Sequence, residues 1–393
     1  MSGAGTGSMT PMNADRSPTG SSGAGFTPPP YPYDRLDRFK PLAARFEGGV
    51  VDLSIGTPCD PPPAPVVEAL SHSNAERGYP ASIGSEALRR AQVRWLRRRF
   101  DVDVEVSQVA ACVGSKEFVA TTPQYLRLRT PGLDTVLYPA VAYPTYEMGA
   151  VLAGCRPVAV PPTPTGGLDL AAIDPVDVQR ALMLWVNSPS NPTGALDDLG
   201  AAAAWGRHHG VPVFSDECYV EYTWDGPGRS VLEHGLDGVI AVHSLSKRSN
   251  LAGLRVATYA GDADLVGYLS EVRKHVGMMI PGPAQAAAVV ALDDDEHVAV
   301  QRQRYRRRLE DVARWLGQWS GIDIPLPAGG FYLWFDTGDG WAFAERLARE
   351  GGAMVSPGDF YGAGGSNNVR VAVVQPDDRL ALVERRLRGD ASR

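Results

Sequence analysis

Cysteine is scarce in this sequence. The four cysteines are Cys59, Cys112, Cys155 and Cys218, and none of them forms a C-x-x-C pair. Three lie in or beside apolar runs, so we expect buried, reduced thiols of a cytoplasmic protein. The spacing indicates neither a disulfide framework nor a zinc site, and we expect no metal.

Long apolar runs and excess positive charge are also missing. No run of 18 apolar residues is present, so we expect no membrane span, and the N-terminus lacks the charged-then-apolar pattern of a signal peptide. The net charge of −7 disfavours nucleic acid and anionic membranes as partners. Two arginine-rich stretches, RWLRRRF from Arg94 and RQRYRRRL from Arg302, carry apolar residues at helical spacing. We expect them to be solvated faces of amphipathic helices.

What the chain does have is length and apolar content, with 393 residues of which 44% are hydrophobic, enough for roughly two domains. Residues 1–29 are rich in Gly, Ser and Thr and are expected to be a disordered tail. We expect an N-terminal arm that joins the small domain over 30–60, a large domain over 61–298 and a small C-terminal α+β domain over 299–393.

Strands and helices alternate within the expected large domain. Continuous apolar strands are predicted at QVAACVG, DTVLYPA, RPVAVPP, ALMLWVNS, VPVFSDE, GVIAVHS and LRVATYAG. Helical periodicity lies between several of them, as in GSEALRRAQVRWLRRRF and LDDLGAAAAWGRHHG. This pattern predicts an α/β fold with a mostly parallel sheet covered by helices on both faces. A long charged helix from about residue 299 and short strands at GGFYLWF and NNVRVAVV form the rest.

Polar side chains follow the predicted strands, where ligands of open α/β sheets bind. The strand ends deliver a set of small, aromatic, amide, acidic and basic residues to one edge: Gly114, Ser115, Lys116, Tyr143, Tyr146, Asn187, Asn191, Asp216, Tyr219 and Lys247. Taken singly, each is a common turn or surface residue. Their conjunction at successive strand ends indicates one binding site.

This set matches the chemical needs of pyridoxal phosphate. Its aldehyde needs a lysine, here Lys247, and its pyridine nitrogen needs a buried carboxylate, here Asp216, to remain protonated. Asn191 and Tyr219 can donate to the ring 3-oxygen, and Tyr143 can stack on the ring. For the phosphate, backbone N–H groups are expected from Gly114-Ser115-Lys116 at a helix start, with Ser244, Ser246 and Arg255 completing the site.

The segments NSPSNPTG, SDECY and HSLSKRSNLAGLR closely resemble the class I aminotransferases of the fold type I pyridoxal-phosphate superfamily. The resemblance covers nearly the whole chain from about Pro30. It implies that Lys247 forms the Schiff base and shuttles the proton, and that Asp216 and Tyr219 complete the catalytic set. It also implies that Arg370 and Gly56 hold the substrate α-carboxylate beside Asn191. By the same resemblance, Tyr79 reaches the phosphate of a second subunit in an obligate homodimer.

Longer stretches, including VDLSIGTPCDP, GYPASIG and VRKHVGMMIPGPAQAA, resemble the actinobacterial-type N-succinyldiaminopimelate aminotransferases of lysine and diaminopimelate biosynthesis. That likeness implies transamination of N-succinyl-LL-2,6-diaminopimelate with 2-oxoglutarate. Such a substrate needs cations at two depths, for which Arg273, Lys274 and Lys116 are candidates, with His275, Met278 and Met279 at the rim. Two departures lie beside the cofactor, since Arg248 replaces a small polar residue and Ala257 replaces a glycine.

Other functions stay open at this point. The same cofactor residues would serve an aspartate, alanine or LL-diaminopimelate aminotransferase, or a carbon–sulfur β-lyase. An effector domain of a DNA-binding regulator would need a winged-helix module upstream, which the sequence does not contain, and the acidic charge argues against it. A cofactor-binding protein without catalysis would not be expected to keep Lys247, Asp216, Arg255 and Arg370 together.

Overall fold

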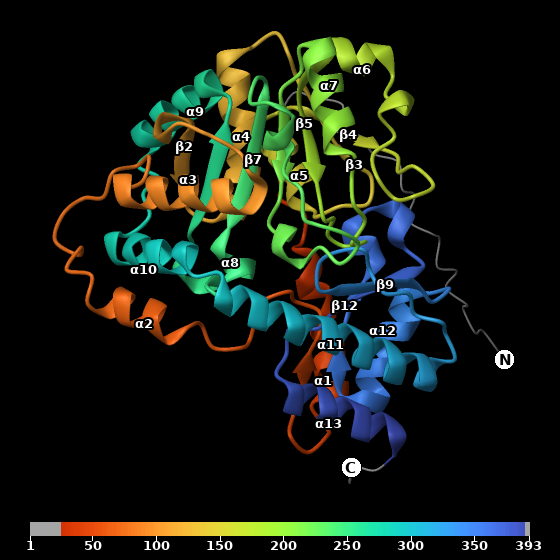
Figure 1. Cartoon of the computed structure of the whole chain (residues 1–393). Coiled ribbons are helices and arrows are strands. Elements are labelled where there is room, and N and C mark those ends of the chain that lie inside the picture. Colours follow the sequence, from red (N-terminus) through yellow and green to blue (C-terminus); the bar gives the residue numbers. More distant parts are fainter. Residues whose placement is uncertain (1–24, 390–393) are drawn as a thin grey trace.

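A central sheet organises the larger, upper part of the molecule (Figure 1). The computed structural model describes residues 25–389, so most of the expected tail lies outside the described residues. The seven strands of the central sheet run in the order β2-β8-β7-β6-β5-β3-β4. β8 pairs antiparallel with both β2 and β7, and the other neighbouring strands pair in parallel. The strands are β2 (Val109–Cys112), β3 (Thr135–Pro139), β4 (Arg156–Val160), β5 (Ala181–Asn187), β6 (Val213–Asp216), β7 (Val239–Ser244) and β8 (Ala257–Gly261).

Each face of this sheet has its own apolar core. In β7, Val239 and Ala241 belong to one core cluster, whereas Ile240 and Val242 belong to the other. The first cluster includes apolar residues of α3 (Glu86–Phe100), α7 (Leu199–His209) and α10 (Gly282–Asp293). The second includes those of α4 (Ser115–Arg129), α5 (Thr145–Leu152) and α9 (Ala263–Val276). Strands buried on both faces carry continuous apolar runs, which explains the sequence pattern and confirms the predicted fold class.

Side-chain caps define where these helices begin. The Ser85 hydroxyl accepts from the Leu88 N–H before α3, and Asp198 and Asp262 accept from the first turns of α7 and α9. Such caps satisfy N–H groups that have no partner within the helix. Two shorter helices, α2 (Ala64–Ser71) and α6 (Pro175–Arg180), lie in the connections.

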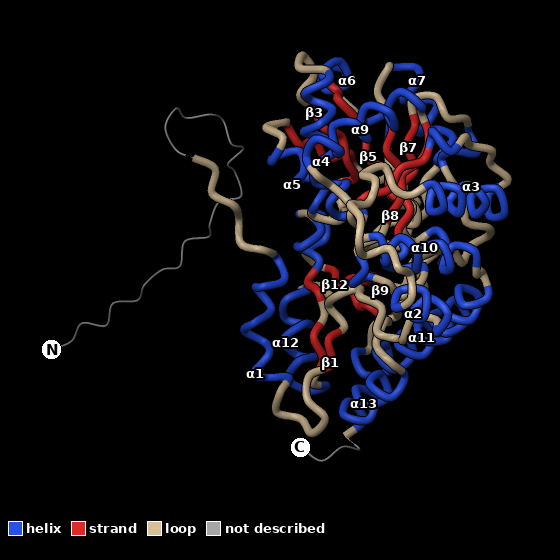
Figure 2. The backbone as a smooth tube through the Cα atoms, turned by 90° about the vertical axis from the view of Figure 1, so that its left-hand side faces the viewer, coloured by secondary structure: helices blue, strands red, loops and turns tan. Residues whose placement is uncertain are grey.

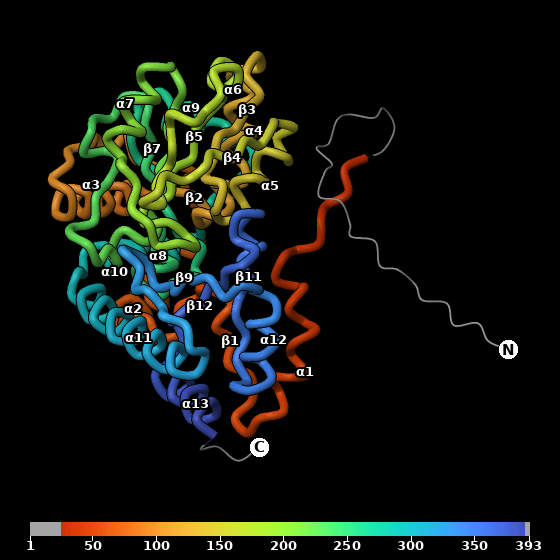
Figure 3. Tube along the Cα trace, turned by 90° about the vertical axis from the view of Figure 1, so that its right-hand side faces the viewer, coloured from red at the N-terminus to blue at the C-terminus, as the bar shows by residue number. Residues whose placement is uncertain are grey.

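The lower part of the molecule combines both ends of the described chain. A third core consists mostly of apolar residues between 36 and 53 and between 305 and 383, and Figures 2 and 3 show α1 beside α12 there. Its strands are short: β1 pairs with β10 in parallel, and β12 lies between β11 and β9 in an antiparallel sheet. The elements are α1 (Lys40–Ala43), β1 (Val51–Asp52), α11 (Glu296–Ser320), β9 (Tyr332–Asp336), α12 (Gly340–Gly351), β10 (Ala353–Met354), β11 (Ser356–Pro357), β12 (Asn368–Ala372) and α13 (Asp377–Arg388).

Two details differ from the expectations drawn from sequence. Cys59 is exposed, whereas the other three cysteines are buried, and all four are free thiols. The arginine-rich stretch on α11 is not wholly solvated, because Arg308 is buried and forms a bidentate pair with Asp60, at 2.6 and 2.9 Å. Helical periodicity marks which side of a helix a residue occupies, but a distant acidic partner decides whether that arginine is buried. No helix within residues 25–389 is apolar over enough length to cross a membrane.

The Asp60–Arg308 pair fastens the chain before α2 to the long helix α11. We expect Asp60→Ala to lower the free energy of unfolding by about 3–5 kcal/mol, because it leaves a buried guanidinium without its main partner. Urea denaturation of the purified protein measures this loss. Arg307→Ala is the matched control, since Arg307 lies beside Arg308 on α11 but forms an exposed pair, with Asp377 of α13. Its loss should cost less than about 1 kcal/mol. Equal losses in both variants would contradict the assignment.

Candidate active site

A cavity of about 410 Å³ lies where the central sheet meets the lower part of the molecule. Most of the residues singled out from the sequence line it: Gly56, Ser115, Lys116, Tyr143, Tyr146, Asn187, Asn191, Asp216, Tyr219, Ser246, Lys247, Arg255 and Arg370. They come from the ends of different strands and from the loop that follows β1. The structure therefore brings most of the predicted set together in one place.

Three predicted residues do not line this cavity. Gly114 lies directly behind it against Arg255. The Ser244 hydroxyl accepts from the Ser246 N–H, 3.2 Å away, and so caps α8 (Leu245–Arg248), the turn that carries Lys247. Tyr79 is 99% exposed, in the loop between α2 and α3. Within a single chain, therefore, Ser244 caps the lysine-bearing turn, and Tyr79 points to solvent.

Asp216 is a buried carboxylate held by two donors. Tyr146 Oη donates to its Oδ2 at 2.9 Å, and the backbone N–H of Cys218 donates to its Oδ1 at 3.2 Å. Asn187 joins the ends of β5 and β6, because its Nδ2 donates to the Asp216 carbonyl and its Oδ1 accepts from the Asn191 N–H, both at 2.8 Å. Burial raises the pKa of Asp216, so a cation placed against this carboxylate would be strongly favoured.

Lys247 extends from α8 into the cavity, where its amine donates to the Gly56 carbonyl. Burial, with the nearby guanidinium groups of Arg370 and Arg255, lowers the pKa of Lys247 to about 8. The neutral fraction of the amine near physiological pH is therefore far larger than for an exposed lysine, although the charged form still predominates below about pH 8. A neutral amine is the nucleophilic form, and it also serves as a general base.

The start of α4 and Arg255 form an anion site on one wall. Gly114 precedes α4 with φ +79°, and because glycine has no side chain, no capping hydrogen bond from this residue occupies the first N–H groups of the helix. An added Cβ at Gly114 would lie 2.0 Å from Arg255 Nη2, so only glycine fits there. Arg255 itself has φ +54°, an uncommon conformation for a side-chain-bearing residue. A helix N-terminus beside a guanidinium is a binding site for phosphate.

Arg370 lies at the opposite wall, on β12. It is buried between the rings of Tyr332 and Tyr361, with its Cζ 4.1 and 4.8 Å from their centroids. Its Nη1 donates to Asn191 Oδ1 at 2.7 Å and its Nη2 to the Ser54 carbonyl at 2.5 Å. Its Nε has no partner within the described chain. A carboxylate would satisfy that unpaired donor.

Several residues of the wall were not predicted. Tyr31 and Tyr33 reach it from the N-terminal arm, and Tyr33 Oη accepts from Arg370 Nη2 at 3.2 Å. Tyr332 bonds Tyr219 through their hydroxyls at 2.9 Å, and an added Cβ at Gly56 would lie 1.8 Å from Tyr332 Oη. No local pattern identifies these tyrosines, because they meet the site only when the lower part packs against the sheet.

The residues that the sequence offered as candidates for substrate specificity divide into one that lines the cavity and five that do not. Lys116 lines the cavity, and its Nζ donates to Tyr31 Oη at 3.2 Å. Arg273 is buried away from it in a bidentate pair with Glu117, at 2.8 and 2.6 Å, and Lys274 pairs with Glu271 on the surface. His275, Met278 and Met279 are not among the lining residues either. Of the three proposed cations, only Lys116 can contact a ligand in this cavity.

The donor set fits pyridoxal phosphate. A buried amine, a buried carboxylate, a helix N-terminus with a guanidinium, and a lining tyrosine would serve the aldehyde, the ring nitrogen, the phosphate and the ring face respectively. The fold and this site together define an enzyme of the pyridoxal-phosphate-dependent class.

Comparison with known proteins assigns the family. Residues 48–385 match the family model for aminotransferase class I and II, and the chain belongs to that family. It is 41% identical over 368 residues to a probable aminotransferase of Mycobacterium tuberculosis, covering 91% of this chain and 85% of that protein. It is 42% identical over 370 residues to 4-dedimethylamino-4-oxo-anhydrotetracycline transaminase OxyQ of Streptomyces rimosus, covering 91% and 99%.

Two further proteins of known name are similar over nearly the whole chain. LL-diaminopimelate aminotransferase of Aquifex aeolicus is 35% identical over 376 residues, covering 92% of this chain and 96% of that protein. Among solved structures, a probable N-succinyldiaminopimelate aminotransferase of Thermus thermophilus is similar with a TM-score of 0.80 and 30% identity, covering 91% and 99%. The members of the aminotransferase class I and II family depend on pyridoxal phosphate.

The lowered pKa of Lys247 predicts how the cofactor-free protein takes up pyridoxal phosphate. Only the neutral amine attacks the aldehyde, so the rate of covalent capture should rise with pH with a midpoint near 8. Stopped-flow absorbance at several pH values measures this rate. A midpoint near 10.5, the ordinary value for lysine, would contradict the burial argument.

Proposed function

We propose that this aminotransferase transfers the amino group between N-succinyl-LL-2,6-diaminopimelate and 2-oxoglutarate, in lysine and diaminopimelate biosynthesis. In the biosynthetic direction, N-succinyl-2-amino-6-oxopimelate and L-glutamate are the reactants. The observation that carries the transaminase assignment is the convergence of Lys247, Asp216, Arg255 and Arg370 on one cavity.

When bound, the cofactor supplies an aldehyde that condenses with amines and a protonated ring that delocalises the charge left at the substrate α-carbon. Each residue then has a defined task. Lys247 Nζ takes the proton from the substrate α-carbon as a general base and then donates it back as a general acid to complete the transfer of the amino group. Asp216 keeps the ring nitrogen protonated, and Asn191 and Tyr219 donate to the ring 3-oxygen. Arg370, beside Gly56, binds the α-carboxylate through two parallel N–H groups.

The charges around the cavity support a substrate with a second carboxylate. Lys116 is a cation at the Tyr31 side, and Arg370 is a cation on β12. Asp216 is the only carboxylate among the described residues that line the cavity, and the ring nitrogen uses it. No acidic group therefore remains there for the distal ammonium of unsuccinylated diaminopimelate. Succinylation converts that ammonium to a neutral amide and adds a carboxylate, which suits this wall.

The main alternative is an LL-diaminopimelate aminotransferase, which the 35% identical relative favours. Turnover of aspartate or alanine, or β-elimination from a sulfur amino acid, would use the same cofactor residues. The lack of a second carboxylate among the described lining residues favours the succinylated substrate over unsuccinylated diaminopimelate, and Lys116 favours a dicarboxylate over alanine.

We also propose that the active form is a homodimer. Tyr79 extends fully into solvent from its loop, which supports a role at a second copy, where its hydroxyl would reach the phosphate. Ser246 and the N–H groups at Ser115 and Lys116 would hold the same phosphate from within the chain.

Free thiols at all four cysteines support a cytoplasmic location.

Replacement of Lys247 tests the catalytic assignment. We expect Lys247→Ala to bind pyridoxal phosphate without covalent attachment and to lose turnover by at least about 100-fold, because its general base is gone. The cofactor absorbance spectrum and steady-state turnover measure the two effects. Lys274→Ala is the control, since that exposed lysine only pairs with Glu271. Turnover by Lys247→Ala at the control's rate would refute the proposal.

Single amino acids test the substrate. The holoenzyme should convert its cofactor to the amine form with L-glutamate and N-succinyl-LL-diaminopimelate, and poorly with unsuccinylated diaminopimelate, aspartate or cystathionine. Absorbance without added keto acid follows each conversion. Lys116→Met should weaken the response to the succinylated compound and leave L-alanine unaffected. Faster conversion by unsuccinylated diaminopimelate would move the assignment to the alternative, and pyruvate release from cystathionine would indicate a lyase.

A further inference from the structure

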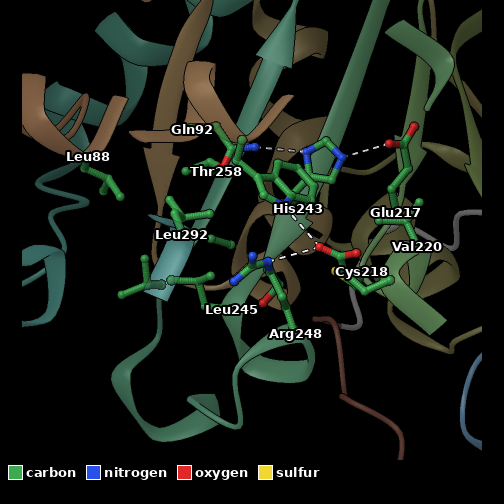
Figure 4. Close-up of a pocket in the computed structure, with 15 residues that line it drawn as sticks. Leu88, Gln92, Glu217, Cys218, Val220, His243, Leu245, Arg248, Thr258 and Leu292 are labelled. Carbon is green, nitrogen blue, oxygen red and sulfur yellow. Dashed lines mark hydrogen bonds and ion pairs between the residues drawn. The ribbon is translucent and has the colours of Figure 1, made fainter. Parts of the chain in front are cut away.

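The turn that carries Lys247 is too short to hold itself in place. Helix α8 has four residues, Leu245–Arg248, whereas helices much shorter than about 12 residues depend on tertiary contacts. Lys247 extends from this turn into the cavity. Arg248, the next residue, is buried and lines a separate pocket (Figure 4). The family resemblance predicts a small polar residue at 248, so the arginine needs a physical explanation.

Arg248 uses all three of its guanidinium nitrogens. Nε donates to Glu221 Oε1 at 3.1 Å, Nη1 to the Ala291 carbonyl at 2.5 Å, and Nη2 to Asp295 Oδ1 at 2.7 Å. Ala291 is near the end of α10, and Asp295 directly precedes α11. One side chain thus joins the lysine turn to the segment after β6 and to the corner where the chain leaves for the lower part of the molecule.

Glu221 is an anion shared by three donors. Besides Arg248, Trp95 Nε1 donates to Oε1 at 3.0 Å and Arg99 Nε donates to Oε2 at 2.9 Å. Burial raises the pKa of Glu221, but the guanidinium groups of Arg248 and Arg99 outweigh it and hold the pKa below its usual value. The carboxylate is therefore charged when it binds Arg248.

The neighbouring residue grips the same turn. Tyr222 Oη donates to the carbonyl oxygens of Lys247 at 3.0 Å and Arg248 at 3.3 Å. Glu221 and Tyr222 belong to one 3₁₀ turn, Val220–Tyr222, which follows Asp216 and Tyr219 along the chain. The segment that positions the ring-binding residues therefore also fixes the backbone beneath the lysine.

We propose that Arg248 is a positioning residue for Lys247, which it holds by joining α8 to Glu221 and to the α10–α11 corner, with Tyr222 fixing the carbonyls of the same turn. This rests on the proposed role of Lys247. A buried ion pair adds little stability compared with apolar packing. We therefore attribute this cluster of buried charges to the positioning of Lys247 and not to the stability of the fold. Misplacement of a reacting group by about 1 Å can cost about 100-fold in rate.

The test compares two arginines that share Glu221. Arg248→Met removes the anchor, and Arg99→Met removes a ligand of the same carboxylate that has no hydrogen bond to α8. Three properties of each holoenzyme are measured: the melting temperature, the rate at which L-glutamate converts the cofactor, and the pH midpoint of the cofactor absorbance band. We expect Arg248→Met to slow conversion by about 10- to 100-fold and to shift the midpoint. Arg99→Met should lower only the melting temperature, and Arg248→Lys should recover part of the rate.

Tyr222→Phe covers the case in which Arg248→Met does not fold, because it deletes one hydroxyl and keeps the ring. It should shift the midpoint and slow conversion in the same direction. The proposal is overturned if Arg248→Met keeps the wild-type rate and midpoint, or if Arg99→Met slows conversion equally. It is also overturned if Arg248→Met is insoluble and Tyr222→Phe keeps the wild-type rate and midpoint. A wild-type holoenzyme that no amino acid converts would instead overturn the proposed function.

Discussion

Burial of a lysine amine beside two guanidinium groups is the constraint on which the site depends. A charged ammonium is disfavoured there, so Lys247 loses its proton near pH 8, where an exposed lysine remains almost wholly charged. The same cavity keeps Asp216 short of a cationic partner and Arg370 with an unpaired N–H. On the proposed roles, each imbalance would be relieved by a different part of a cofactor–amino acid pair: an aldehyde, a ring cation and a carboxylate. The cavity thus presents charged and polar groups complementary to the proposed ligands before they bind.

The sheet imposes this arrangement because its parallel strands end at one edge. β5, β6 and β7 are neighbours, so Asn187, Asp216 and Ser244 lie at adjacent strand ends, and the register pairs Asn187 with Asp216. Asn187 then bridges the two ends through its amide. Continuous apolar strands require both faces to be covered, and this directs the polar residues to the ends. Fold and site therefore have a common origin in the strand pattern.

Sequence patterns predicted what is local and missed what depends on distant packing. The strands, the helices between them and the residues at strand ends could be read directly, because period and polarity change at each strand end. Tyr33 and Tyr332 could not, since they meet Arg370 and Tyr219 only through contacts across 337 and 113 residues of chain. Arg273 illustrates the converse error: it looked available as a cation, yet Glu117 holds it inside the core.

Arg248 shows why a departure from a family pattern is informative when its partners are known. From sequence it signalled only altered geometry near the lysine. In the structure its guanidinium meets Glu221 and the α10–α11 corner, contacts that a small polar residue could not make. α11 continues into the part of the molecule that carries Arg370. On the proposed roles, a change at residue 248 would therefore act on the proton-transferring amine and, through the α10–α11 corner, on the helix that leads into the lower part of the molecule.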